Sequence, residues 1–313
     1  MNLTPVDNYL EAVRFGKPEY MPRGNEEIFH YVQLKGHYRQ ATWTDQWGVG
    51  WVLDIPGTSP FPKNNPLPDI QRLDEYRLPD PDRLFDGFGD EVEKIKRARS
   101  EGKLIQGGYT YMLFERVWAV MGLENFLVAL LEEPEPVRAL LHKIATFARR
   151  VFENMLELGV DAISFSEDLG SQRALMFSPA HFIDFFMPEY RFAFEDVIRE
   201  GKMIDFHSCG CVDSIVEQLA ELGVSVLNPI QARANDVAYI KRVTYGKMAL
   251  CGAIDSHLIL TGSVEDVKRE TARIIEILKP GGGYICAPDQ GFPEYPPENI
   301  AALYETAAAL GIY

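Results

Sequence analysis

From about residue 100 onward, short apolar runs alternate with longer amphipathic segments, and this alternation restricts the fold more than any other feature of the chain. Strands that are each followed by a helix pair in parallel, because the helix carries the chain back to the start of the sheet. The expected strands are 103–108, 161–166, 202–207, 224–229, 248–254 and 282–288. The expected helices are 111–131, 134–158, 178–200, 212–222, 235–243, 263–278 and 297–309.

The strand count predicts an α/β fold, a (β/α)8 TIM barrel with N-terminal helical and loop additions. A first strand near residues 20–27 brings the expected number to about seven, so one strand of a closed barrel escapes the pattern. An open doubly wound sheet is the alternative, but no glycine-rich phosphate loop follows any strand. The expected additions are a helix over 1–16, a hairpin with an ordered loop over 44–69 and a helix over 82–101. The regular pattern indicates a single domain over residues 1–313.

Composition limits the partners and the compartment. The net charge of −15 argues against nucleic acid and anionic membranes as partners, because both would be repelled. No apolar run approaches the roughly 20 residues of a membrane span, and the N-terminus lacks the apolar core of a secretory signal. Four cysteines in 313 residues make no disulfide framework, which favours reduced thiols and the cytoplasm. Exposed aromatic loops and an acidic surface would permit a homodimer.

A histidine and a cysteine stand together where the strand over 202–207 ends, in the sequence FHSCGC. Side chains alternate along a strand, so His207 and Cys209 point the same way. An imidazole and a thiolate on one face make half of a tetrahedral zinc site. The alternative is a hydrogen-bonded core histidine beside an inert cysteine. The position at a strand's carboxyl end, followed by glycine, favours the metal.

Acidic residues follow two other strands. Glu167 and Asp168 come directly after the run AISFS, and at most one of them faces the barrel mouth if the strand continues. One would be a metal ligand or a general acid, and the alternative is the N-cap of the next helix. Asp255 follows the strand over 248–254, with the same two interpretations, and is an expected substrate-binding residue.

Several segments together resemble the uroporphyrinogen decarboxylase superfamily. They are DQWGVGW, DAISFSEDLGSQRALMFSP, FHSCGCV, VLNPIQ, CGAID and GGGYICAPDQGFPEYPPENI. The resemblance spans nearly the whole chain and implies a (β/α)8 barrel with its site at the carboxyl ends of the strands. True decarboxylases carry an arginine-rich MRQAGR-like segment that grips carboxylates, where this chain has YMPRGNEEIF. A single Arg23 facing Glu26 and Glu27 cannot neutralise a polycarboxylate. The chain is therefore more similar to the decarboxylase-like and corrinoid-linked methyltransferase branch.

The resemblance also bears on the ligands. Zinc methyltransferases of this superfamily use an HxC pair, matched by His207 and Cys209, and a later cysteine, whose place Gln290 takes here. Related cobalamin-independent methionine synthases have an acidic ligand at a position corresponding roughly to Asn228. Both departures are to amides, which are poor substitutes for thiolate on zinc. Residues that could complete the site are Cys286, Asp289, Glu167 and Asp168.

The sequence thus supports two functions. The first is a methyltransferase that moves a methyl group between a small methylated substrate and a corrinoid carried by a partner protein, with zinc on His207 and Cys209. The alternative is a zinc-free carboxy-lyase, in which Asp45 protonates a carbanion while Asn228 and Gln290 orient a carboxylate. The resemblance places Trp47 near the mouth as a substrate contact. A third possibility is that the barrel serves only to bind a corrinoid or a partner, without catalysis.

Overall fold

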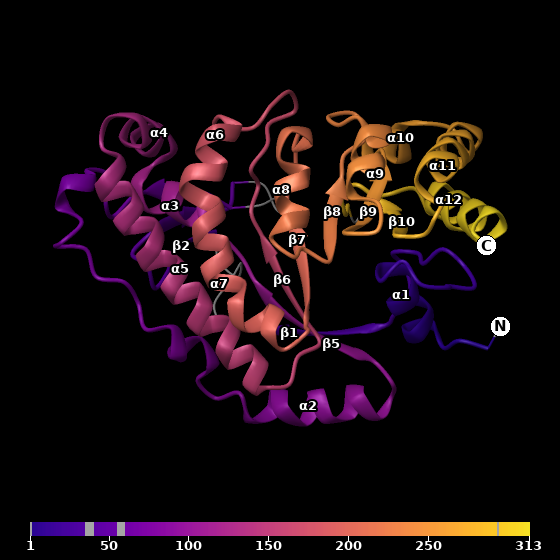
Figure 1. The fold of residues 1–313 in the computed structure, drawn as a ribbon, viewed down its shortest axis with the longest axis horizontal. Coiled ribbons are helices and arrows are strands. Elements are labelled where there is room, and N and C mark those ends of the chain that lie inside the picture. Colours follow the sequence, from indigo (N-terminus) through magenta and orange to yellow (C-terminus); the bar gives the residue numbers. More distant parts are fainter. Residues whose placement is uncertain (1, 35–40, 55–59, 293) are drawn as a thin grey trace.

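A curled, seven-stranded parallel sheet forms the centre of the protein (Figure 1). The computed structural model describes residues 2–34, 41–54, 60–292 and 294–313. The strand order is β1-β5-β6-β7-β8-β9-β10, all neighbours being parallel. The strands are β1 Phe29–Gln33, β5 Leu104–Tyr109, β6 Ala162–Ser166, β7 Met203–His207, β8 Val226–Ile230, β9 Ala249–Ile254 and β10 Tyr284–Pro288. The six strands expected from residue 103 onward are all present, shifted by two residues or fewer at each end.

The first strand lies later in the chain than the sequence pattern indicates. Residues 29–33 form β1, which pairs with β5, whereas the segment before it makes only an isolated parallel bridge between Arg23 and Cys286. Two backbone hydrogen bonds of 2.9 Å hold that segment to β10, from Gly24 N to Cys286 O and from Cys286 N to Pro22 O. The described residues therefore form a barrel-like sheet of seven strands, and closure with an eighth strand stays a prediction.

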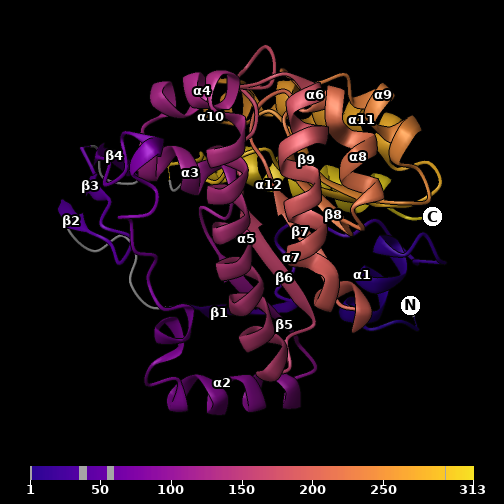
Figure 2. The same ribbon diagram turned by 60° about the vertical axis from the view of Figure 1, so that its left-hand side comes forward.

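Helices pack around the sheet, with α5 and α7 side by side over β6 and β7 (Figures 1 and 2). The helices are α1 Pro5–Val13, α2 Gly89–Ser100, α3 Phe114–Met121, α4 Leu123–Glu132, α5 Pro134–Glu157, α6 Pro179–His181, α7 Met187–Arg199, α8 Val216–Glu221, α9 Val237–Thr244, α10 Ser256–Thr261, α11 Val264–Leu278 and α12 Pro297–Leu310. Short 3-10 turns lie at η1 Ile70–Arg72, η2 Pro81–Phe85 and η4 Asp213–Ile215, and η3 Phe182–Phe186 is a π-helical turn.

Two of the expected helices are interrupted. The helix expected over 111–131 divides into α3 and α4 at Gly122, whose positive φ of 89° ends one helix and starts the next. The helix expected over 178–200 contains the π-helical turn η3. Helix α10 was not expected, because six residues are too few to show a helical period. No helix among the described residues is long and apolar enough to cross a membrane.

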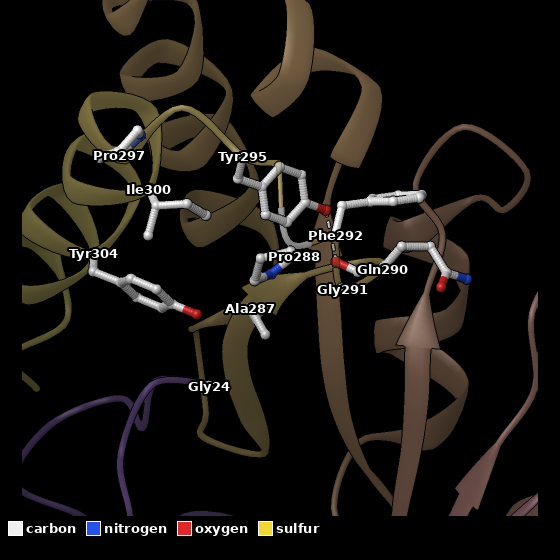
Figure 3. A pocket seen from close by; sticks show the side chains of 10 residues that line it. All are labelled: Gly24, Ala287, Pro288, Gln290, Gly291, Phe292, Tyr295, Pro297, Ile300 and Tyr304. Carbon is white, nitrogen blue, oxygen red and sulfur yellow. Dashed lines mark hydrogen bonds between the residues drawn. The ribbon is translucent and has the colours of Figure 1, made fainter. Parts of the chain in front are cut away.

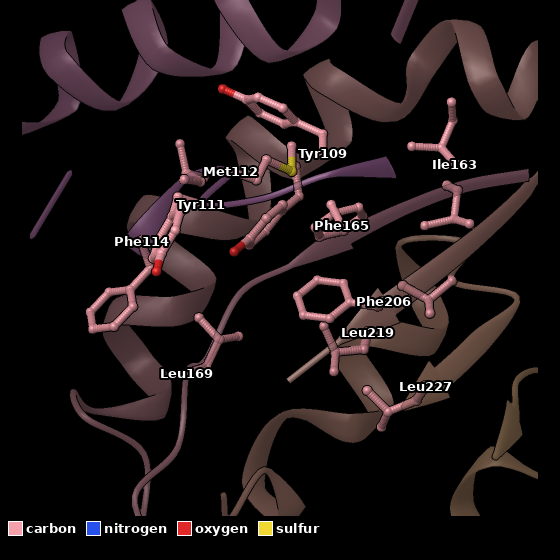
Figure 4. Packing of buried hydrophobic residues seen from close by; sticks show 14 of the residues in the cluster. Tyr109, Tyr111, Met112, Phe114, Ile163, Phe165, Leu169, Phe206, Leu219 and Leu227 are labelled. Carbon is pink, nitrogen blue, oxygen red and sulfur yellow. The ribbon is translucent and has the colours of Figure 1, made fainter. Parts of the chain in front are cut away.

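Two hydrophobic cores determine where a polar site can lie. The larger one fills the layer between sheet and helices, where Phe165 and Phe206 of adjacent strands meet edge to face at 4.7 Å (Figure 4). The smaller one joins Tyr9 and Val13 of α1 to residues at the beginnings of the strands. Those residues are Leu104, Val226, Ala249 and Ile285. Helix α1 thus covers the amino ends of the strands, and their carboxyl ends are left for polar side chains.

The residues between β1 and α2 form a small antiparallel sheet of three strands, β2 Thr42–Thr44, β3 Gly50–Val52 and β4 Phe61–Asn64. The hairpin expected within 44–69 is therefore present, and residues 55–59 of that range lie outside the described part of the chain. In the turn between β2 and β3, Asp45 accepts hydrogen bonds from the backbone N–H groups of Trp47 and Val49, at 2.9 and 3.0 Å.

Candidate metal centre

Three side chains converge where β6 and β7 end. Asp168, His207 and Cys209, here called the ligand triad, each offer one ligand atom, and these atoms lie within 4.8 Å of one another. The His207 Nε2 atom is 3.5 Å from Cys209 Sγ and 3.7 Å from Asp168 Oδ1. The side chains of His207 and Asp168 are 34% and 45% exposed, so the triad is open to a ligand from outside.

Two glycines bring the loops that carry the triad together. Gly210 has a φ of 84°, which residues with a Cβ rarely adopt, and Gly170 lies directly against it. A Cβ on Gly170 would lie 2.6 Å from the backbone N and O of Cys211. The close approach allows Cys211 N to donate to Ser171 O at 2.7 Å, and Cys209 N to Asp168 Oδ1 at 2.8 Å. The backbone contact therefore sets the position of Asp168 relative to His207 and Cys209.

Replacing Gly210 by alanine should lower both stability and metal binding. The new Cβ would meet the carbonyl group of Gly170, and the positive φ adds strain, for a combined cost of about 2–4 kcal/mol in unfolding free energy. Gly246→Ala is the matched control, since Gly246 has a φ of 74° and nothing within 4 Å of its Cβ position. Urea unfolding and zinc content of both variants are the measurements. Equal losses in the two would show that the contact with Gly170 has no role.

Two of the distances within the triad are compatible with a zinc ion. Bonds of about 2.0–2.3 Å at tetrahedral angles place neighbouring ligand atoms about 3.4–3.6 Å apart, close to the 3.5 and 3.7 Å found here. The other histidine nitrogen, His207 Nδ1, lies 3.0 Å from Asn228 Oδ1, which leaves Nε2 facing the triad. Three protein ligands of the N, O and S type with an open fourth position are typical of catalytic zinc sites. The residues present therefore fit this metal.

The metal-free thiol of the triad is a weak acid. Burial, with the nearby negative charge of Asp168, raises the pKa of Cys209 to about 12. Because zinc binds the thiolate, binding must release the proton that this group carries at neutral pH. We expect the apparent zinc affinity to rise about tenfold per pH unit between about pH 7 and pH 9. Chelator competition across this range measures it, and an affinity independent of pH would argue against coordination by Cys209.

The two adjacent acidic residues after β6 have different surroundings. Glu167 is fully buried and accepts backbone N–H bonds from Leu113, Phe114 and Glu115 at the start of α3. Burial raises the pKa of Glu167 to about 7, although these bonds and the Tyr190 hydroxyl at 2.9 Å oppose the shift. Glu167 thus caps α3 rather than the following helix, and Asp168 is the one of the pair that belongs to the triad.

The remaining residues proposed from the sequence are distributed over the strand ends. Gln290 Nε2 lies 2.7 Å from Cys209 Sγ, so this amide borders the triad. Asn228 contacts His207 as described above. Asp255 caps α10 through the N–H of His257 at 2.9 Å and lies 3.6 Å from Arg233. Asp289 accepts from the N–H of Ser256 at 2.9 Å. Cys286 is fully buried in the large core and is not part of the triad.

Asp45 and Trp47 lie in packed surroundings. Asp45 Oδ2 accepts from Trp51 Nε1 and from Arg116 Nη1, each at 2.9 Å, and the two charged side chains are 5% and 2% exposed. Trp47 is 2% exposed, with its ring 4.6 Å from that of Phe147 and the Arg116 guanidinium 4.8 Å from its centre. Both residues attach the small antiparallel sheet to α3.

A cavity of about 540 Å³ is lined in part by Gln290, the residue whose amide contacts Cys209 of the triad (Figure 3). Its wall is formed by residues of β10, α12 and the segment between them, and by Gly24. Phe292, Tyr295, Ile300 and Tyr304 are among its lining side chains, while the Gln290 side chain points away from them (Figure 3) and contacts Cys209. The cavity thus has a largely aromatic and aliphatic lining with a few polar groups, and Gln290 links it to the candidate metal centre.

Sequence reasoning missed several residues around the triad. Glu115 is buried, accepts from Ser166 Oγ at 3.1 Å, and has a pKa raised by burial and by the charges of Asp168 and Glu167. Gln231 and Asn235 fix the loop after β7 by accepting from Gly210 N at 2.8 Å and Val212 N at 2.9 Å. For Gln231 the available signal was its position two residues after the expected strand over 224–229, whereas Glu115 and Asn235 fall within the expected helices over 111–131 and 235–243.

The chain belongs to the uroporphyrinogen decarboxylase (URO-D) family, whose model matches residues 45–310. Among solved structures, a methyltransferase from Methanosarcina mazei aligns over 98% of this chain and 99% of its own, with a TM-score of 0.76 and 19% identity. A B12-independent methionine synthase from Shewanella sp. W3-18-1 aligns over 70% of this chain and 64% of its own, with a TM-score of 0.46 and 13% identity. No curated protein sequence matches the chain significantly. The first similarity shows a shared fold.

Proposed function

We propose that the protein is a zinc-dependent methyltransferase that moves a methyl group between a small methylated substrate and a corrinoid carried by a partner protein. The observation that supports it most is the triad of Asp168, His207 and Cys209, whose spacing and donor types suit a catalytic zinc ion. The methyltransferase from Methanosarcina mazei has the same fold over nearly its whole length. Four free cysteines are consistent with a cytoplasmic protein, which we also propose.

Asp168, His207 and Cys209 would hold the ion, and Gln290 would border its open side. Zinc bound there would act as a Lewis acid on the heteroatom that carries or receives the methyl group. In the direction of the corrinoid, the bond between that heteroatom and the methyl carbon would break, the methyl group would pass to the reduced corrinoid of the partner protein, and the heteroatom would take up a proton. Glu115, a buried carboxyl with a raised pKa beside Asp168, is the proposed source of this proton. The aromatic cavity next to Gln290 would take the body of the substrate.

Two contacts weigh against the decarboxylase alternative. Arg23 is paired with Glu26 at 3.0 Å, so the one arginine in this segment already has a carboxylate partner. Asp45, which would protonate the carbanion, is buried against Arg116 and accepts from three further N–H groups. Neither residue is free to act on a carboxylated substrate in this conformation.

The function is tested by incubating the purified protein with free methylcobalamin and a panel of small thiols and amines. We expect about one zinc per chain and methylation of at least one acceptor, accompanied by spectral change of the corrinoid. Protein without zinc that transfers no methyl group would overturn the proposal. Release of carbon dioxide from a carboxylated pyrrole or aromatic acid would support the decarboxylase instead.

A further inference from the structure

A chain of hydrogen bonds leads from the triad into the interior of the sheet. His207 Nδ1 contacts Asn228 Oδ1 at 3.0 Å, and Asn228 Nδ2 donates to Asp205 Oδ1. The other oxygen, Asp205 Oδ2, accepts from Gln106 Nε2 at 2.7 Å. The chain crosses three strands, β5, β7 and β8, and we call Gln106, Asp205 and Asn228 the amide relay.

The strand register puts these residues in line. His207 and Asn228 are direct neighbours across the parallel pair β7 and β8. Asp205 precedes His207 by two residues and therefore lies on the same face of β7. The relay is thus attached to a hydrogen-bonded sheet rather than to loops, which limits how far any of its members can move.

The direction of the hydrogen bonds in the relay is determined by Asp205. A carboxylate only accepts hydrogen bonds, so both amides that touch it must present their NH2 groups. Asn228 then has only its oxygen left for His207. An oxygen accepts, so the proton of the neutral imidazole must sit on Nδ1, and Nε2 keeps the lone pair that faces Asp168 and Cys209.

We infer that Asp205 and Asn228 are positioning residues that hold His207 in the Nδ1–H tautomer and so prepare Nε2 for metal binding. The inference rests on the proposed metal site for its purpose, but the tautomer itself is a property of the metal-free chain. Partners of this kind on the far nitrogen of a ligand histidine fix its tautomer and orientation. In many zinc sites a carboxylate contacts the ligand histidine directly. Here Asn228 stands between His207 and the carboxylate of Asp205.

The test is nitrogen-15 NMR of the imidazole groups in metal-free protein, with the His207 signals assigned by their absence in His207→Gln. We expect the proton of His207 on Nδ1 in the wild type. In Asn228→Ala, which removes the acceptor, the signal should shift to mainly the Nε2–H form. Asp205→Ala, which releases the Asn228 amide to rotate, should shift it in the same direction. Asn299→Ala is the control, because Asn299 is a buried asparagine whose amide donates to the backbone oxygens of Ile259 and Gly262.

Zinc affinity provides the second measurement. Loss of such a partner should weaken zinc binding about 10–100-fold in Asn228→Ala and leave Asn299→Ala unchanged. A wild-type proton on Nε2, or a tautomer unaffected in both relay variants, would overturn the inference. Protein with the expected tautomers that binds no zinc would support the relay and contradict the proposed function, so the two failures can be told apart.

Discussion

His207→Ala and Cys209→Ala should each abolish zinc binding and lower methyl transfer by about a thousandfold. Each substitution removes one of the three proposed protein ligands, and two ligands would hold the ion too weakly. A Lewis acid supplies several kcal/mol of transition-state stabilisation, and about 4 kcal/mol corresponds to a thousandfold in rate. Metal content by plasma mass spectrometry and turnover with methylcobalamin measure the two effects on the same samples.

Cys211→Ala is the matched control for these variants. Cys211 lies in the same loop after β7, but its thiol is not part of the triad. We expect it to keep about one zinc per chain and wild-type turnover. Zinc retained in Cys209→Ala, or lost in Cys211→Ala, would show that the metal binds elsewhere than at the triad.

Asp45→Ala should destabilise the protein by about 3–5 kcal/mol, because it leaves the Arg116 guanidinium buried without its carboxylate. The same change removes the acceptor of Trp51 Nε1 and of two backbone N–H groups in the turn between β2 and β3. Urea unfolding measures the loss. If the role of Asp45 is only to stabilise the fold, the folded fraction of the variant should still bind about one zinc per chain.

The double variant Asp45→Ala with Arg116→Met separates a buried charge from a catalytic role. Without the arginine there is no uncompensated cation, so the double variant should be more stable than Asp45→Ala alone. The comparison is the exposed ion pair of Arg150 with Asp82, whose side chains are 40% and 56% exposed. Arg150→Met should lower the free energy of unfolding by no more than about 1 kcal/mol. An Asp45→Ala variant of normal stability that has lost turnover would assign Asp45 to catalysis.

The sheet was predictable because its strands appear as short segments with regularly spaced apolar residues. Segment 202–207 is an example, since the buried Ile204 and Phe206 of β7 alternate with the half-buried Met203, Asp205 and His207. The first strand was placed too early, because residues 20–27 are joined to the sheet by the bridge from Arg23 to Cys286 while β1 forms at Phe29–Gln33. Nothing in local periodicity marks a strand whose partners, such as Leu104 for Phe29, lie so far along the chain.

The candidate site could be predicted only in part, because its residues meet through the fold. His207 and Cys209 share one strand end, so alternation sufficed to place them together. Which of Glu167 and Asp168 joins the triad could not be predicted, because it depends on α3. The N–H groups that hold Glu167 belong to residues 52 to 54 positions earlier in the chain. Arg116 lies 71 residues from Asp45, and no spacing rule connects them.

X-ray absorption at the zinc edge of the purified protein tests the central claim most directly. Coordination by the triad predicts one sulfur at about 2.3 Å, from Cys209, and the remaining ligands as nitrogen or oxygen at about 2.0–2.2 Å, including His207 and Asp168. The sulfur contribution should disappear in Cys209→Ala and persist in Cys286→Ala. Two sulfur ligands, or a sulfur signal that depends on Cys286, would contradict the proposed centre.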